Sequence, residues 1–321
     1  MNILVYIQSD NDTISRNSLE ALVGAQNIVK KMNGCLKAVC FNADVTNELL
    51  KYNINEIICP SNNEELNNYN PLYHTSALEQ IVHKEQNIDL IVFGHTYQAR
   101  DWVPRLSARL DCPFVSDCVA FNYSSELEFI RQMYQGKVNT NISVKGLAII
   151  SFQSGAFRAD AIDLGTSTIK NIEFNFSSVS KCIRPGDKFK ESKGEVDLTR
   201  SEIIVSVGRG IGKEENMPII NDLNDSLGGE IGSSRPVVDY GWLSHERQVG
   251  SSGQVVTPKM YLAIGISGAI QHQVGMKGSD NIVAINKDPN APIFEIADYG
   301  VVGDLFEILP KLTSSIKDIK S

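Results

Sequence analysis

The sequence has few cysteines, and no two of them are spaced as a redox or metal-binding motif. Six cysteines are spread over 321 residues without a single CxxC pair. A disulfide framework, a zinc site and an iron–sulfur centre all need grouped thiols, so this spacing argues against each of them. We therefore expect reduced thiols in a reducing compartment and no bound metal. The six are Cys35, Cys40, Cys59, Cys112, Cys118 and Cys182.

Long apolar runs and an excess of positive charge are also missing. No stretch approaches the ~20 apolar residues of a membrane span, and no secretory signal opens the sequence. The formal net charge is −8, which argues against a nucleic-acid groove because phosphate binding needs a basic face. We expect a cytoplasmic protein with no membrane insertion and no nucleic-acid partner. A small anionic ligand remains open, since backbone N–H groups and one or two arginines suffice to bind it.

The first part of the sequence alternates strand-like apolar runs with helical patterns. Runs at 3–7, 36–41, 56–59 and 90–93 alternate with helical spacing of apolar residues over 15–31, 71–86 and 99–110. This order predicts a mostly parallel sheet with helices on both faces. Short alternating runs at 128–134, 141–145 and 148–152 predict antiparallel strands that complete the same sheet.

A second series of the same kind follows a charged stretch that contains Gly and Pro. Strands are predicted at 203–207, 259–264, 282–285 and 293–296, and helices at 216–227 and 302–317. We predict an α/β protein of two domains. The N-terminal α/β domain, 1–185, has a mostly parallel sheet plus antiparallel strands; a linker, 186–200, leads to a doubly wound C-terminal domain, 201–321.

The most informative segment is LAIGISGAIQH, residues 262–272. An apolar strand runs through two glycines into a polar helix start that carries His272. The free N–H groups and positive end of a helix favour an anion or an electron-rich ring edge at such a junction. Taken alone, His272 is better explained as an ordinary helix histidine whose hydrogen bonds are satisfied within the protein.

Two further loops carry small or charged residues where strands end. The segment 208–212 reads GRGIG after a strand, and we weigh a phosphate or ribose contact about evenly against a loop that simply needs small residues. Arg209 and Arg235 follow strands, which moderately favours recognition of an anion. The loop QVGSSG, 248–253, lets backbone approach a flat ligand, although an ordinary flexible loop would look the same.

A hydrolase is the alternative from another functional class. The segment 265–269, GISGA, approaches the nucleophile elbow GxSxG with Ser267 as the nucleophile, but Ala269 replaces the last glycine. His272 is only five residues further on, whereas a catalytic triad takes its histidine from a separate loop. We therefore rank this alternative low.

From Arg235 to Leu312 the sequence resembles the α subunit of electron-transfer flavoproteins. The resemblance is carried by SRPVVDYGW (234–242), QVG (248–250), YLAIGISGAIQH (261–272), IVAINKDP (282–289) and APIFEIADYG (291–300). It implies a heterodimer with a β subunit and FAD bound in the C-terminal domain. The residues at the family's FAD-contact positions are Arg209, Ser234, Arg235, Gln248, Val249, Gly250, Ser251, Ser252, Ser267, Gly268, Ala269, Ile270, Gln271, His272, Asn286, Asp304 and Leu305.

The resemblance also implies roles for several of these residues. Arg235 and His272 would stabilise negative charge on the isoalloxazine ring, Ser252 would donate to its N5 atom, and the adenosine end would be held by Asn286, Asp304 and Leu305. One departure from the family is Ser251, which replaces a longer amide side chain.

The function implied is that of an electron carrier, not a substrate-converting enzyme. Its partners would be flavin dehydrogenases, such as acyl-CoA dehydrogenases of fatty acid β-oxidation, and a quinone oxidoreductase of the respiratory chain. An electron-bifurcating member of the same family is the alternative within this class.

Overall fold

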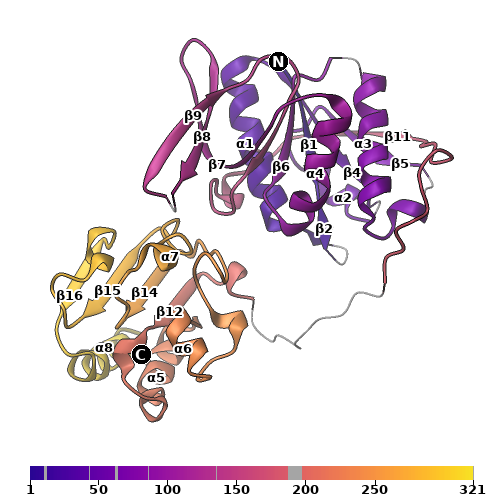
Figure 1. Ribbon diagram of the computed structural model, residues 1–321. Coiled ribbons are helices and arrows are strands. Elements are labelled where there is room, and N and C mark those ends of the chain that lie inside the picture. Colours follow the sequence, from indigo (N-terminus) through magenta and orange to yellow (C-terminus); the bar gives the residue numbers. More distant parts are fainter. Residues whose placement is uncertain are drawn as a thin grey trace. The chain divides into compact units, whose positions relative to one another are not determined.

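A computed structural model describes residues 1–10, 13–42, 44–61, 64–85, 87–134, 136–186 and 197–320. The chain divides into two compact units, Met1–Lys188 and Phe189–Ser321, each built on its own sheet (Figure 1). The predicted α/β fold with two domains is confirmed. The predicted linker, 186–200, spans the division between the units, and its residues 187–196 lie outside the described residues.

The N-terminal unit contains a nine-stranded sheet in the order β11-β5-β4-β1-β6-β10-β7-β8-β9. Neighbouring strands from β11 to β7 are parallel, and β8 and β9 extend the sheet by antiparallel pairing. A short hairpin, β2(Ser9–Asp10) and β3(Thr13–Ile14), stands apart. The sheet strands are β1(Asn2–Ile7), β4(Cys35–Cys40), β5(Glu56–Pro60), β6(Leu90–Gly94), β7(Phe114–Tyr123), β8(Leu127–Met133), β9(Val138–Ser143), β10(Ala148–Phe152) and β11(Thr168–Ile172).

The prediction that 148–152 is antiparallel is wrong. Strand β10 inserts between β6 and β7 and is parallel to both. All five of its residues are buried, which is typical of a central parallel strand covered on both faces. The sequence pattern alone gives neither the neighbours nor the direction of so short a strand.

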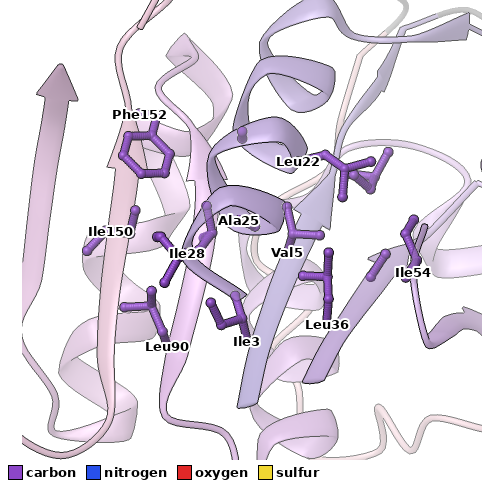
Figure 2. Close-up of a cluster of buried hydrophobic side chains, with 14 of the residues drawn as sticks. Ile3, Val5, Leu22, Ala25, Ile28, Leu36, Ile54, Leu90, Ile150 and Phe152 are labelled. Atoms are coloured by element: carbon purple, nitrogen blue, oxygen red, sulfur yellow. The ribbon is translucent and has the colours of Figure 1, made fainter. Parts of the chain in front are cut away.

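Helices cover both faces of this sheet. On one face α1(Arg16–Met32) places Leu22, Ala25 and Ile28 against Ile3 and Val5 of β1 (Figure 2). Spacings of three residues keep these side chains on one side of the helix. The opposite face is covered by α3(Pro71–Glu85) and α4(Tyr97–Leu110), and α2(Thr46–Leu49) is a single turn.

The C-terminal unit contains a five-stranded, wholly parallel sheet in the order β13-β12-β14-β15-β16. One face is covered by α5(Pro218–Leu227) and α8(Leu305–Lys320), and the other by loops and short helical turns. Two shorter helices are α6(Arg235–Asp239) and α7(Ile270–Gln273). The strands are β12(Ile203–Val207), β13(Glu230–Ser233), β14(Met260–Ile264), β15(Ile282–Asn286) and β16(Tyr299–Val302).

The predicted strand at 293–296 is wrong. Residues Pro292–Glu295 form a 3-10 helix that starts at a proline, and the last strand is β16. Four residues with isoleucine at both ends fit a strand and a buried turn equally well. Strand β13, with Gly and Ser among its four residues, carries no strand pattern and is absent from the prediction.

Within the described ranges, no helix is long and apolar enough to cross a lipid bilayer.

Candidate functional site

A pocket lies at the carboxyl edge of the C-terminal sheet, where the strand order reverses. Strand β12 has β13 on one side and β14 on the other, and open parallel sheets bind ligands at such a switch point. The pocket has a volume of about 540 Å³, within the range typical of small-molecule sites. Its walls are the loops that follow β12, β13, β14 and β15, together with the loop of residues 249–252.

Glycines let the loops after β12 and β14 lie against each other at this edge. The N–H of Gly210 donates to the carbonyl oxygen of Gly265 at 3.0 Å, and a Cβ on Gly210 would lie 2.7 Å from the Gly265 Cα. Gly265 itself has φ +62°, a conformation that side chains disfavour. The GRGIG segment therefore needs small residues for contact between two backbones.

The loop QVGSSG is fixed by hydrogen bonds on both sides. The Gln248 Nε2 group donates to Ser252 Oγ at 2.9 Å, and the Ser251 N–H donates to the Gln271 carbonyl at 2.7 Å. Gly250 has φ +144°, and a Cβ there would lie 2.8 Å from the Gln271 oxygen. The loop thus packs directly on the segment that carries His272.

His272 lines the pocket as a buried, neutral imidazole. Its Nε2 atom is 2.9 Å from the hydroxyl of Tyr261, and only 6% of the residue is exposed. Burial lowers the pKa of His272 to about 4, against a smaller opposing effect of a hydrogen bond with the Val249 backbone. Burial therefore favours the neutral imidazole, which offers hydrogen bonds, and the role of His272 toward the flavin stays a prediction.

The expected positive helix end at this junction is also weaker than predicted. Helix α7 has four residues, a single turn. A helix dipole is the sum of aligned peptide units, so one turn contributes little.

Positive charge at the pocket comes instead from Arg209 and Lys287. Both line the pocket and are exposed, and neither forms an ion pair with another described residue. Asp288, the neighbour of Lys287, uses its carboxylate to accept the N–H of Asn290 at 3.0 Å. Two cations without partners at the mouth of a pocket favour a ligand with negative charge.

Most of the site residues predicted from sequence meet in this one pocket. Those that line it are Arg209, Ser234, Val249, Gly250, Ser251, Ser252, Ser267, Ala269, Gln271, His272 and Asn286. The others, which are not among its lining residues, are Arg235, Gln248, Gly268, Ile270, Asp304 and Leu305. Contact of either group with a cofactor stays a prediction.

Several residues of the second group have structural roles. Asp304 Oδ1 accepts the N–H of Phe306 at 2.9 Å and so caps α8, and Leu305 is buried in the core between the sheet and that helix. Gly268 has φ +82°, and its Cα lies so close to Ile293 that a Cβ would be 2.3 Å from the Ile293 nitrogen. The side chain of Arg235 is 69% exposed and pairs with Asp239 at 3.4 Å.

Sequence reasoning missed part of the pocket wall. Lys287 and Asp288 directly follow the end of β15. Their position at the carboxyl end of a predicted parallel strand could have identified them as pocket residues. Gly210 and Gly265 lie in the two glycine-bearing segments described from the sequence, but neither was named as a contact residue. The others reach the wall through the three-dimensional packing. The missed residues are Gly210, Pro236, Gly265, Ile266, Lys287, Asp288, Ala291 and Pro292.

These residues fit the FAD that the sequence resemblance implies. Glycine backbones and short side chains leave room for a flat ring system, while Arg209 and Lys287 suit a pyrophosphate. The neutral imidazole of His272 and the hydroxyls of Ser252 and Ser267 supply hydrogen-bonding groups at the same wall.

Comparison with known proteins agrees with this arrangement. The model of the electron transfer flavoprotein FAD-binding domain matches residues 197–277, and that of the electron transfer flavoprotein domain matches residues 3–176. Electron transfer flavoprotein subunit alpha of Thermoanaerobacterium thermosaccharolyticum is 36% identical, with 99% of this chain and 98% of that protein covered. The Bacillus subtilis subunit alpha is 35% identical, covering 86% and 84%. The acryloyl-CoA reductase electron transfer subunit beta of Anaerotignum propionicum is also 35% identical, covering 87% and 84%. The chain therefore belongs to the α-subunit family of electron transfer flavoproteins, and FAD is the cofactor of its C-terminal domain.

Proposed function

We propose that this chain pairs with an electron transfer flavoprotein β subunit and carries electrons from flavin dehydrogenases to a quinone oxidoreductase. The observation that carries the proposal is the pocket at the β12–β14 switch point, most of whose lining residues lie in the part of the chain matched by the FAD-binding family model, 197–277. Bound FAD supplies the electron-transfer chemistry, and the protein supplies its binding, orientation and electrostatic surroundings.

The pocket divides the work of holding FAD between charged and neutral residues. Arg209 and Lys287 bind the pyrophosphate, because they are cations without protein partners. Ser252 Oγ accepts a hydrogen bond from Gln248, so its own hydroxyl proton is free to be donated to N5 of the ring.

Asn286 holds the pocket wall through both ends of its side chain. Its Nδ2 donates to the Ile266 carbonyl at 2.9 Å, and its Oδ1 accepts the N–H of Asp288 at 3.0 Å. We therefore assign Asn286 to the support of two FAD-binding loops and not to a direct side-chain contact with the adenosine.

The hydrolase alternative lacks the geometry of a catalytic triad. Ser267 has no hydrogen bond to a histidine among the described residues, and the Nε2 atom of His272 is already bonded to Tyr261. A serine nucleophile needs a base within hydrogen-bonding distance. This supports the role of an electron carrier over that of an enzyme acting through Ser267.

Dehydrogenases of acyl-CoA esters are the donors that we propose. The relative from Anaerotignum propionicum is named as an electron transfer subunit of an acryloyl-CoA reductase, so that protein serves an oxidoreductase of a CoA ester, and this supports a CoA-ester oxidoreductase as partner here. The same chemistry of flavin-to-flavin transfer applies to an acyl-CoA dehydrogenase.

The test is co-expression of the chain with its β subunit, followed by a visible absorption spectrum of the purified complex. We expect a flavin spectrum that is lost on Arg209→Ala/Lys287→Ala, whereas Lys259→Ala keeps the flavin because exposed Lys259 pairs with Glu202 away from the pocket. A colourless wild-type complex would overturn the proposal. The flavin content per heterodimer, one or two, separates a simple carrier from a bifurcating one.

A further inference from the structure

A buried tyrosine lies behind the histidine of the FAD pocket. Tyr261 belongs to β14, its side chain is fully buried, and it does not line the pocket. Its hydroxyl is 2.9 Å from Nε2 of His272, which does line the pocket. The ring centroids are 6.0 Å apart and the planes are inclined by 58°, so the contact is made by the polar edges and not by stacking.

Both partners of this hydrogen bond are neutral. Burial raises the pKa of the Tyr261 phenol, and burial lowers the pKa of His272 to about 4. A neutral imidazole has one nitrogen that donates and one that accepts. The phenol can donate to Nε2 or accept from it, and Nδ1 takes the opposite role to Nε2 in either case.

The other nitrogen, Nδ1, is available for a further contact. It is buried and has no hydrogen bond of ordinary geometry within the described part of the chain, although the Val249 backbone lies close enough to oppose the fall in the pKa of His272. Val249 belongs to the loop QVGSSG, which forms one wall of the pocket. The imidazole thus lies between a fixed tyrosine and a loop of the cofactor site.

Tyr261 is itself held by the strand next to it. In the register of the sheet Tyr261 is paired with Ile204 of β12, and the buried Ser206 lies two residues further along that strand, on the same face. The Ser206 hydroxyl lies near enough to oppose the rise in the pKa of Tyr261. Ser206 Oγ itself forms no hydrogen bond of ordinary geometry among the described residues, so the bond between Tyr261 and His272 is the polar contact that leads from this sheet to the pocket.

We propose that Tyr261 is a positioning residue of the flavin site, whose hydroxyl fixes the orientation of the His272 ring and the nitrogen that carries its proton. The proposal rests on the proposed function. The single turn of α7 is a weak constraint on a side chain, so the hydroxyl supplies what the backbone does not. A phenylalanine would fill the same space in the core but would leave Nε2 without its partner.

The experiment is a double-mutant cycle on the complex with the β subunit. The variants are Tyr261→Phe, His272→Ala and the two together, and the readouts are the dissociation constant of FAD and the first reduction potential of the bound flavin. We expect Tyr261→Phe to weaken FAD binding roughly five- to tenfold and to shift the potential. In the His272→Ala background the same substitution should change neither quantity, because the tyrosine acts through the histidine.

The matched control is Tyr52→Phe, another buried tyrosine, in the N-terminal unit. It should leave both readouts unchanged. An effect of Tyr261→Phe that is equal with and without His272 would overturn the proposal, since it would show a general packing role. A Tyr261→Phe complex with wild-type affinity and potential would overturn it as well.

A second measurement serves if Tyr261→Phe does not fold. The ¹⁵N shifts of the His272 ring in the wild-type complex report which nitrogen is protonated. One fixed tautomer is expected, and shifts averaged over both tautomers would refute the proposal. A complex without flavin would refute the proposed function itself, whereas a flavin-bearing complex that is insensitive to Tyr261→Phe would refute only the role of Tyr261.

Discussion

The two sheets of this protein use their carboxyl edges in opposite ways. In the N-terminal unit the order also reverses at one strand, β1, but aromatic side chains fill much of the space beyond it. Tyr6, Phe41, His74 and Trp102 contact one another there with ring centroids 5.1 to 6.4 Å apart. In the C-terminal unit glycine backbones contact each other at the same edge.

The two edges differ in the volume of the pocket that each contains. The pocket at the edge of β1 and β4 has a volume of about 260 Å³, against about 540 Å³ at the edge of β12 and β14. A parallel sheet therefore provides the position of a site, and the residue types after its strands decide how much room is left. Aromatic side chains after the strands fill the space at the edge, whereas glycines after the strands place no side chain there and leave a larger pocket.

The largest effect that we predict falls on the aromatic edge. Trp102 is fully buried, so Trp102→Ala should lower the free energy of unfolding of the N-terminal unit by about 3–5 kcal/mol. FAD affinity should not change, because Trp102 belongs to α4 of the N-terminal unit. Chemical denaturation and flavin titration measure the two quantities. A loss of FAD affinity that persists in the folded variant would show that the two edges are coupled.

The glycine edge should respond in its ligand affinity as well as in its stability. At Gly268 a Cβ would lie 2.3 Å from the Ile293 nitrogen, and φ is +82°. We expect Gly268→Ala to cost about 2–4 kcal/mol of stability and to weaken FAD binding. Gly228 has φ +73° with nothing within 4 Å of a Cβ, so Gly228→Ala isolates the cost of the backbone conformation. Equal losses in the two variants would contradict the role given to close packing.

The sequence predicts the site better than it predicts the wall around it. The position of 262–272 after an apolar strand indicated a ligand site, the family resemblance named Ser267, Gln271 and His272 there, and all three line the pocket. The lowered pKa of His272 could not be predicted, since it comes from burial of the ring, which only the three-dimensional packing produces. The direction of β10 depends on pairing with β6 and β7, which no pattern within five residues encodes.

Buried histidines near both edges should make the protein less stable in acid. Burial lowers the pKa of His74 to about 3 and that of His272 to about 4, whereas the unfolded chain takes up protons near pH 6.5. The unfolded state therefore binds more protons as the pH falls below about 6.5, and each histidine removes up to about 1.4 kcal/mol per pH unit until its folded pKa is reached. Between pH 6.5 and 5 this amounts to about 2 kcal/mol each.

Unfolding measured against pH checks this expectation one unit at a time. His74→Phe should flatten the acid limb of the N-terminal unit, while the same change at the exposed His83 should leave it as it is. An unaltered slope in His74→Phe would mean that other groups control the acid sensitivity of that unit.

The smallest effect concerns two arginines of the glycine edge. Arg209 lines the pocket without an ion pair, whereas the side chain of Arg235 is 69% exposed and already pairs with Asp239. Water and a carboxylate both screen the charge of Arg235, so its effect on a flavin in the pocket should be below about 1 kcal/mol. We expect Arg235→Ala to lower the first reduction potential of the flavin only slightly and Arg209→Ala to weaken FAD binding more strongly. Potentiometric and binding titrations of the two variants in the complex show which substitution has the larger effect on the reduction potential and on FAD affinity. If Arg235→Ala had the larger effect on both readouts, its guanidinium would have to leave Asp239 and contact the ring, and the charge of the site would then depend on a residue outside the pocket wall.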